Sequence, residues 1–218
     1  MQLKLTDEMK VIMGIIIFIG ICISTYYIYG SHNFKNDKEE YCYELLLNTK
    51  RLLDDNNIEF FLDYGTLLGA YRDNQFIPHD SDIDISIYDY NYGHLLKLLD
   101  NTILKKYNLQ IVTGPHRGGN LNSLKLIKFK DKLLHNKLQY NNEIYIDIYK
   151  VYFQPKTTLY KFYNTKFNIP TNTDKYLKHL YGDTWRTPIK GKHGKWPTSS
   201  KTIKNTEWFK DNIIEHKL

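Results

Sequence analysis

The most constraining feature of this chain is a short segment in which acidic and aliphatic residues alternate. The segment reads Asp82-Ile83-Asp84-Ile85-Ser86-Ile87. Strict alternation is typical of a β-strand, because successive side chains point to opposite faces of the sheet. We therefore expect the isoleucines to enter the core and the carboxylates of Asp82 and Asp84 to leave one face together. Two carboxylates held this close repel each other unless a positive charge offsets them.

A further acid lies in a second apolar segment. Asp147 interrupts Ile144-Tyr145-Ile146-Asp147-Ile148-Tyr149, which also predicts a strand. If this strand pairs beside the first, the carboxylates of Asp82, Asp84 and Asp147 converge. Mg²⁺ prefers hard oxygen ligands of this kind. The sequence thus predicts a site for one or two Mg²⁺ (or Mn²⁺) ions that would bridge phosphate oxygens.

A third feature precedes the acidic strand. Gly65 and Thr66 follow a predicted strand and open a short helix, which Arg72 closes. Backbone N–H groups at a helix start attract anions, and glycine lets a phosphate approach closely. The planar guanidinium of Arg72 is suited to clamping a phosphate. Together with the acids, these residues predict phosphoryl or nucleotidyl transfer.

Each of these features alone has an ordinary structural explanation. A strand with alternating acids is often a solvent-facing edge, and a Gly-Thr pair before a helix is often only a cap. A single acid such as Asp147 is usually a surface or turn residue. The functional interpretation rests on their order and spacing within residues 65–84, followed by an acid in a later strand.

The other predicted elements mix helices with strands. Because they do not alternate as βαβ units, the sequence predicts an α+β fold in which helices flank a mixed sheet. Periodicity predicts helices over 41–56, 66–72, 92–106, 176–180 and 207–216. It predicts strands over 58–62, 82–87, 109–112, 124–129 and 143–153.

Residues 11–29 carry no charge, and tyrosines gather at the end of this run. As a helix the run would span about 28 Å, close to the hydrocarbon thickness of a bilayer. It therefore predicts one transmembrane helix; a cleaved signal peptide and a buried soluble helix are the alternatives. We expect residues 1–35 to form a tail, a membrane anchor and a joint, and residues 36–218 to form one catalytic domain.

Composition excludes several classes of protein. Apolar residues at 42% and aromatic residues at 15% exclude a disordered chain. The net charge is +6, but the lysines are interspersed with acids, so we expect no nucleic-acid partner. Cys22 and Cys42 are the two cysteines of the chain, too few for a disulfide framework or a cysteine-based zinc site.

Four segments resemble, in order, motifs of the LicD/fukutin family. The sequence DYGTLLGAYR at 63–72 is similar to the family pattern GTLLGAxR, and FIPHDSDIDI at 76–85 is similar to IPWDDDxDI. YIDIY at 145–149 resembles a later VDIF strand, and YLKHLYGDTW at 176–185 resembles YLKxxYGDxW. The resemblance implies a nucleotidyltransferase fold of the DNA polymerase β type.

The same resemblance implies an activity. Members transfer an alcohol phosphate, such as phosphocholine or ribitol phosphate, from a CDP-linked donor to a glycan, with metal. Fukutin-type members carry an N-terminal anchor, which implies a domain on the lumenal side of the secretory pathway (Golgi or ER). By position, the implied metal ligands and catalytic acids are Asp82, Asp84 and Asp147, and the implied donor-phosphate residues are Gly65, Thr66, Arg72 and Asp80, with Asp80 also a neighbour of the metal.

Two positions depart from the family pattern. His79 stands where the family usually has tryptophan, and Ser81 stands where it has an acid. Both leave the Asp82 and Asp84 pair intact, but they put the choice of donor in doubt. Two other functions stay open: an enzyme that attaches the nucleotide itself, and a catalytically silent membrane scaffold with the same fold.

Overall fold

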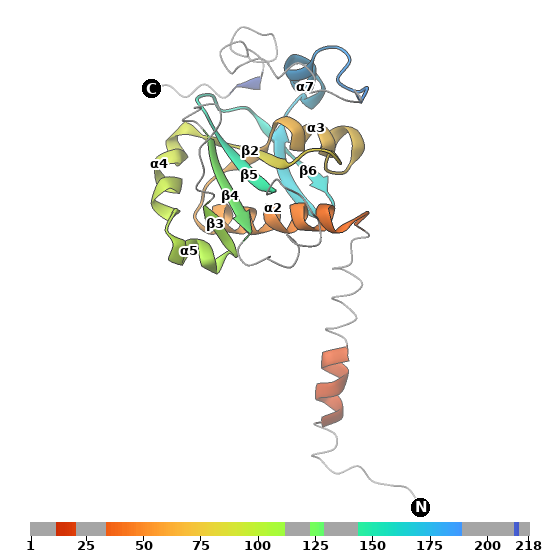
Figure 1. Cartoon of the computed structure of the whole chain (residues 1–218), viewed down its shortest axis with the longest axis vertical. Helices are drawn as coiled ribbons and strands as arrows, with labels where there is room; N and C mark the ends of the chain where they lie inside the picture. The colour runs from red at the N-terminus through yellow and green to blue at the C-terminus, as the bar shows by residue number, and fades with distance from the viewer. Residues whose placement is uncertain (1–11, 21–33, 112–122, 129–143, 189–211, 214–218) are drawn as a thin grey trace, which may run out of the picture. The chain divides into compact units, whose positions relative to one another are not determined.

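The computed structural model describes residues 12–20, 34–111, 123–128, 144–188 and 212–213 (Figure 1). The chain divides into two compact units, Met1–Lys35 and Asn36–Leu218. In the first unit, residues 12–20 form a helix with exposed side chains. Within the described ranges, no helix has both the length and the apolar character needed to cross a membrane. The rest of the span predicted over 11–29 lies outside those ranges, so the transmembrane helix stays a prediction.

The second unit contains a five-stranded sheet, a two-stranded sheet and flanking helices, which confirms the predicted α+β class with a mixed sheet (Figure 1). Its elements in chain order are α2 (Asp37–Asp55), β1 (Phe60–Leu62), α3 (Tyr64–Asp73), β2 (Asp82–Tyr88), α4 (Asp89–Leu98), α5 (Asn101–Lys106), β3 (Leu109–Ile111), β4 (Ser123–Lys128), β5 (Tyr145–Val151), β6 (Thr157–Phe162), β7 (Thr165–Pro170) and α7 (Thr173–Tyr181).

The larger sheet brings the two acidic strands together. Its strand order is β1-β2-β5-β4-β3, so β2 and β5 are neighbours. They run parallel, whereas the other pairs in this sheet are antiparallel. In the register of β2 and β5, Asp84 lies opposite Asp147. Paired residues on adjacent strands point to the same face, so Asp84 and Asp147 lie on one face of the sheet.

The side chains of β2 alternate between the core and the opposite face of the sheet, as the sequence predicts. Ile83, Ile85 and Ile87 are fully buried, at 0% exposed. Helix α3 contacts β2, and helix α2 contacts β3, β4 and β5 (Figure 1). At roughly 25 cal/mol per Å² of buried apolar surface, these isoleucines contribute strongly to holding β2 at the centre of the domain.

Two predictions of local structure were incomplete, and a third is not tested by the described residues. The helix predicted over 92–106 is two helices, because the side chain of Asp100 accepts hydrogen bonds from the N–H groups of Thr102 and Ile103 and so starts α5. The β6–β7 hairpin was not predicted, although aromatic and β-branched runs flank its turn. The helix predicted over 207–216 lies largely outside the described residues.

A buried carboxylate connects three of these elements. Asp63 caps α3 and is 1% exposed. Its Oδ2 accepts a hydrogen bond from Ser86 of β2 at 2.6 Å, and its Oδ1 accepts one from the Tyr176 hydroxyl of α7 at 2.8 Å. Burial raises the pKa of Asp63 to about 6 despite these donors. The position of α3 over β2 therefore depends on a carboxylate that needs its hydrogen bonds.

We predict that Tyr176→Phe lowers the free energy of unfolding by about 1–3 kcal/mol at pH 8, because an ionised buried carboxylate loses a donor. Protonated Asp63 stabilises the fold at low pH, and that stability is lost as the pH rises through about 6. The hydroxyl favours the ionised form, so its removal should cost less at pH 5. Urea unfolding at the two pH values measures the difference.

Tyr160→Phe is the matched control. The Tyr160 hydroxyl donates to the neutral carbonyl of Ala70 at 3.2 Å. Its loss should cost no more than about 1 kcal/mol, with no dependence on pH. Equal losses at pH 5 and pH 8 for Tyr176→Phe would contradict the role assigned to Asp63.

Candidate active site

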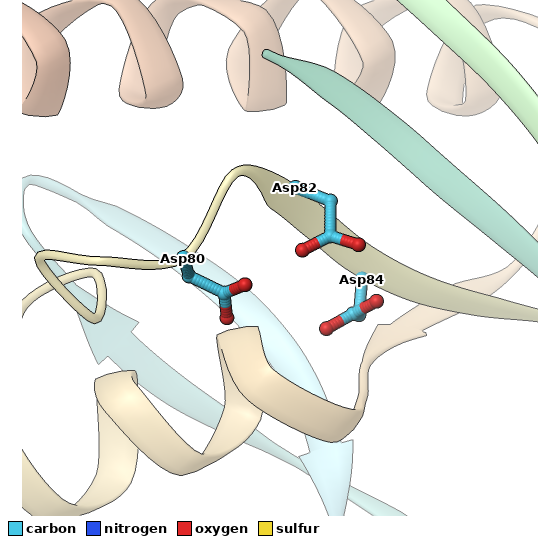
Figure 2. Close-up of side chains that lie close together, drawn as sticks. All are labelled: Asp80, Asp82 and Asp84. Carbon is cyan, nitrogen blue, oxygen red and sulfur yellow. The ribbon is translucent and has the colours of Figure 1, made fainter. Parts of the chain in front are cut away.

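Three carboxylates converge where β2 begins. Asp82 and Asp84 extend from the strand and Asp80 from the preceding loop, and Figure 2 shows their oxygens directed toward a common space. One oxygen from each lies within 4.8 Å of the others. Octahedral Mg²⁺ binds oxygens at about 2.0–2.1 Å, which puts neighbouring ligands about 3 Å and opposite ligands about 4 Å apart. The three side chains would have to move only slightly toward one another to coordinate such an ion.

The charges of this cluster are costly without a cation. Asp84 is 6% exposed, and burial raises its pKa well above the usual range. The neighbouring charges of Asp82, Asp80 and Asp147 raise it further. Burial and then Asp82 raise the pKa of Asp80 to about 8. A bound divalent ion would remove this penalty by favouring the charged carboxylates.

The composition of the cluster differs from the predicted set of ligands. The prediction grouped Asp82 and Asp84 with Asp147 as metal ligands, and it put Asp80 with the donor phosphates and beside the metal. In the described ranges, the group of three acids close enough to share an ion contains Asp80 instead. Asp147 lies opposite Asp84 on β5 and is 6% exposed. Direct metal binding by Asp147 stays a prediction, while its charge already acts on Asp84.

The start of α3 borders this cluster. The N–H of Gly65 donates to Oδ2 of Asp84 at 2.9 Å. A Cβ added at Gly65 would lie 2.5 Å from Oδ2 of Asp80 and 3.0 Å from Oδ2 of Asp84. Glycine is therefore required here for close packing against the carboxylates. The helix start faces negative charge of the protein itself, and a contact with donor phosphate stays a prediction.

Thr66 and Arg72 have structural partners. Thr66 is 2% exposed, and its hydroxyl oxygen accepts a hydrogen bond from the backbone N–H of Asp84 at 2.8 Å, which fixes β2 against α3. The Arg72 guanidinium donates to Oδ2 of Asp73 and, at 3.3 Å, to the carbonyl of Trp185. Arg72 follows Gly65 by seven positions (72 − 65), so it lies about 10 Å further along the helix. The structure does not bring Arg72 to the carboxylates, and its predicted phosphate contact stays a prediction.

The sequence analysis did not identify two tyrosines and one lysine that lie around the cluster. Tyr149 of β5 and Tyr64 of α3 have ring centroids 4.8 Å apart, and the Tyr149 hydroxyl donates to Oδ2 of Asp147 at 3.4 Å. The spacing of two between Asp147 and Tyr149 was a signal for this contact. The other missed residue, Lys38 of α2, contacts the loop that carries Asp80 and had no local signal.

We predict that Asp84→Asn makes the metal-free protein more stable at pH 8, since one desolvated like charge disappears and the amide oxygen can still accept from Gly65. Raised carboxyl pKa values mean that stability is present at low pH and lost as the pH rises toward about 8. The gain in Tm should therefore be smaller at pH 5. For a domain of this size each kcal/mol corresponds to about 2–4 °C.

Metal addition and a surface variant complete this test. Mg²⁺ or Mn²⁺ should raise the Tm of the wild type and have little effect on Asp84→Asn, because binding to the folded state stabilises it. Asp54→Asn removes a carboxylate that is 51% exposed and should leave both responses unchanged. A less stable Asp84→Asn protein at pH 8 would contradict the electrostatic description of the cluster.

The sequence of this chain is similar to those of several known proteins. The sequence model described as "LicD/FKTN/FKRP, nucleotidyltransferase domain" matches residues 57–198. An uncharacterized protein of Rickettsia typhi is 32% identical over 115 residues, covering 47% of this chain and 36% of that protein. Ribitol-5-phosphate transferase FKTN of Homo sapiens is 29% identical over 157 residues, covering 67% of this chain and 33% of that protein.

The chain thus spans about a third of the length of these curated relatives. Among solved structures, a lincosamide antibiotic adenylyltransferase bound to lincomycin has a TM-score of 0.39 and 13% identity, covering 66% of this chain and 85% of that one. That likeness is too low to support a conclusion. The match to the family model covers well over half of the chain and includes every residue of the acidic cluster. The chain therefore belongs to the LicD/FKTN/FKRP family, and residues 57–198 are its nucleotidyltransferase domain.

Proposed function

We propose that this protein transfers an alcohol phosphate, such as phosphocholine or ribitol phosphate, from a CDP-linked donor to a glycan. The observation that carries the proposal is the convergence of Asp80, Asp82 and Asp84 at the start of α3, inside the family domain. Relatives named ribitol-5-phosphate transferase support the class of group transferred. The reaction depends on Mg²⁺ or Mn²⁺.

The acidic cluster suits the charge that this reaction develops. Asp80, Asp82 and Asp84 would hold the ion, and a bound ion supplies positive charge against the donor pyrophosphate. The N–H of Gly65 at the start of α3 donates to Asp84, so this helix end stabilises a carboxylate that would hold the ion.

The transfer step is a nucleophilic substitution at phosphorus. The acceptor hydroxyl oxygen attacks the phosphorus attached to the alcohol, and the bond from that phosphorus to the oxygen of CMP breaks. CMP leaves as an anion, and the hydroxyl proton moves to a carboxylate. We assign that proton to Asp147, because it lies on the strand beside Asp84 and shares its face of the sheet.

A second candidate is attachment of the nucleotide itself to an alcohol phosphate or another small acceptor. The description of the family domain as a nucleotidyltransferase favours it. The same cluster would then act on the α-phosphate of CTP and release pyrophosphate. The two functions differ in the leaving group, so one assay separates them.

The proposal predicts that full-length protein with Mg²⁺ or Mn²⁺ releases CMP from CDP-ribitol or CDP-choline when a glycan acceptor is present. Asp82→Asn should slow release by about a hundredfold or more, as expected when an electrostatic contact to the transition state is lost. Gly65→Ala should also lose activity, since its methyl group would displace Asp80.

Gly93→Ala is the matched control, because a Cβ at Gly93 of α4 meets nothing within 4 Å. It should be fully active and, with better helix propensity, more stable by about 0.5–1 kcal/mol. Release of pyrophosphate from CTP, with no release of CMP from the CDP-linked donors, would establish the second candidate. If the Asp82→Asn protein has the same effect in cells as the wild type, the protein is instead a catalytically silent scaffold.

A further inference from the structure

We propose that Lys38 is a positioning residue for the acidic cluster: its ammonium group, at the start of α2, holds the loop that carries Asp80. The inference rests on the metal site of the proposed function and adds a residue to it. Lys38 is 9% exposed, which is unusual for lysine unless its charge is satisfied. Its role follows from what that charge contacts.

The ammonium contacts two carbonyls of a single turn. Nζ of Lys38 donates to the carbonyl oxygen of Pro78 at 2.7 Å and to that of Asp80 at 2.5 Å. The turn is closed by a hydrogen bond from the N–H of Asp80 to the carbonyl of Ile77 at 3.1 Å. Hydrogen bonds in which the donor is charged are stronger than those between neutral groups. Lys38 therefore fixes the main chain at the residue that supplies one of the three carboxylates.

The carboxylate of the same residue is held from the other side. Oδ2 of Asp80 packs against Gly65 at the start of α3, 2.5 Å from where a Cβ would lie. The main chain of Asp80 is thus fixed from α2 and its side chain rests against α3. Because Asp82 and Asp84 are fixed by strand pairing, Asp80 is the member of the cluster whose place depends on a loop contact.

The charge of Lys38 has a second effect of opposite sign. It offsets part of the rise that burial and Asp82 cause in the pKa of Asp80, but it also repels a cation. We expect positioning to dominate, because removing Lys38 deprives the carbonyls of Pro78 and Asp80 of their shared donor and so releases the loop that carries Asp80. The measured direction of the change in metal affinity decides between the two effects.

The test is Mn²⁺ binding to the full-length protein, followed by electron paramagnetic resonance of the free ion. Lys38→Met keeps the length of the side chain and removes its donors and charge. Its Kd for Mn²⁺ should be about tenfold to a hundredfold weaker, the usual effect of losing a group that orients a metal ligand. Lys38→Arg keeps the charge and should fall between Lys38→Met and the wild type.

Lys50→Met is the matched control on the same helix. Lys50 pairs with Asp54 at 2.7 Å on the outer side of α2, so its loss should leave the Kd unchanged. Thermal unfolding of every variant shows whether it is folded. In the CMP-release assay, saturating Mn²⁺ should restore the rate of Lys38→Met but not that of Asp82→Asn, because the former keeps all three ligands.

The outcomes separate the inference from the proposed function. Unchanged or tighter Mn²⁺ binding by Lys38→Met, with the wild type binding normally, overturns the role of Lys38 alone. A Lys38→Met rate that excess Mn²⁺ does not restore also overturns it. Absence of Mn²⁺ binding by the wild type overturns the metal site, and the inference fails with it.

Discussion

The domain is organised around the repulsion between four carboxylates, of which those of Asp84 and Asp147 are buried. Asp80, Asp82 and Asp84 are held within reach of a single ion, and Asp147 adds its charge from the next strand. Each lost hydration shell and each like-charge contact opposes folding. This unfavourable electrostatic energy is concentrated at one site, which is typical of a site that binds a cation or a charged substrate.

Neighbouring elements fix these carboxylates from several directions. The isoleucines of β2 anchor the strand in the core, and parallel pairing with β5 sets the acids of both strands on one face. Thr66 accepts a hydrogen bond from the backbone of Asp84, Asp63 joins α3 to β2 and α7, and Lys38 holds the preceding loop. Because the carboxylates are already held in place, binding a metal ion would require little rearrangement of the protein.

Sequence periodicity predicted what depends on local geometry. A period of two placed Asp82 and Asp84 on one face and their isoleucines in the core, and family motifs located Asp147 and the start of α3. Only the family motif put Asp80 beside the metal, because periodicity does not describe the loop from Ile77 to Asp80, whose path depends on contacts with α2 and α3. The contact with Lys38 of α2 joins residues 42 positions apart and leaves no periodic pattern.

Residue type alone also did not reveal the partners that an arginine has in the fold. Arg72 suited a phosphate clamp by its chemistry, yet its place near the end of α3 directs it to Asp73 and to the carbonyl of Trp185. The β6–β7 hairpin depends on strand pairing, and the break between α4 and α5 depends on the cap that the Asp100 side chain provides. The residues of both features are visible in the sequence, but the same residues are equally compatible with other local structures.

The most direct test of the central claim is the location of Mn²⁺ by anomalous scattering in crystals of the protein grown with the ion. We expect one strong anomalous peak, at which the ion is bound by carboxylate oxygens of Asp80, Asp82 and Asp84. Mn²⁺ bound elsewhere, or no bound metal in a protein that still releases CMP, would contradict it.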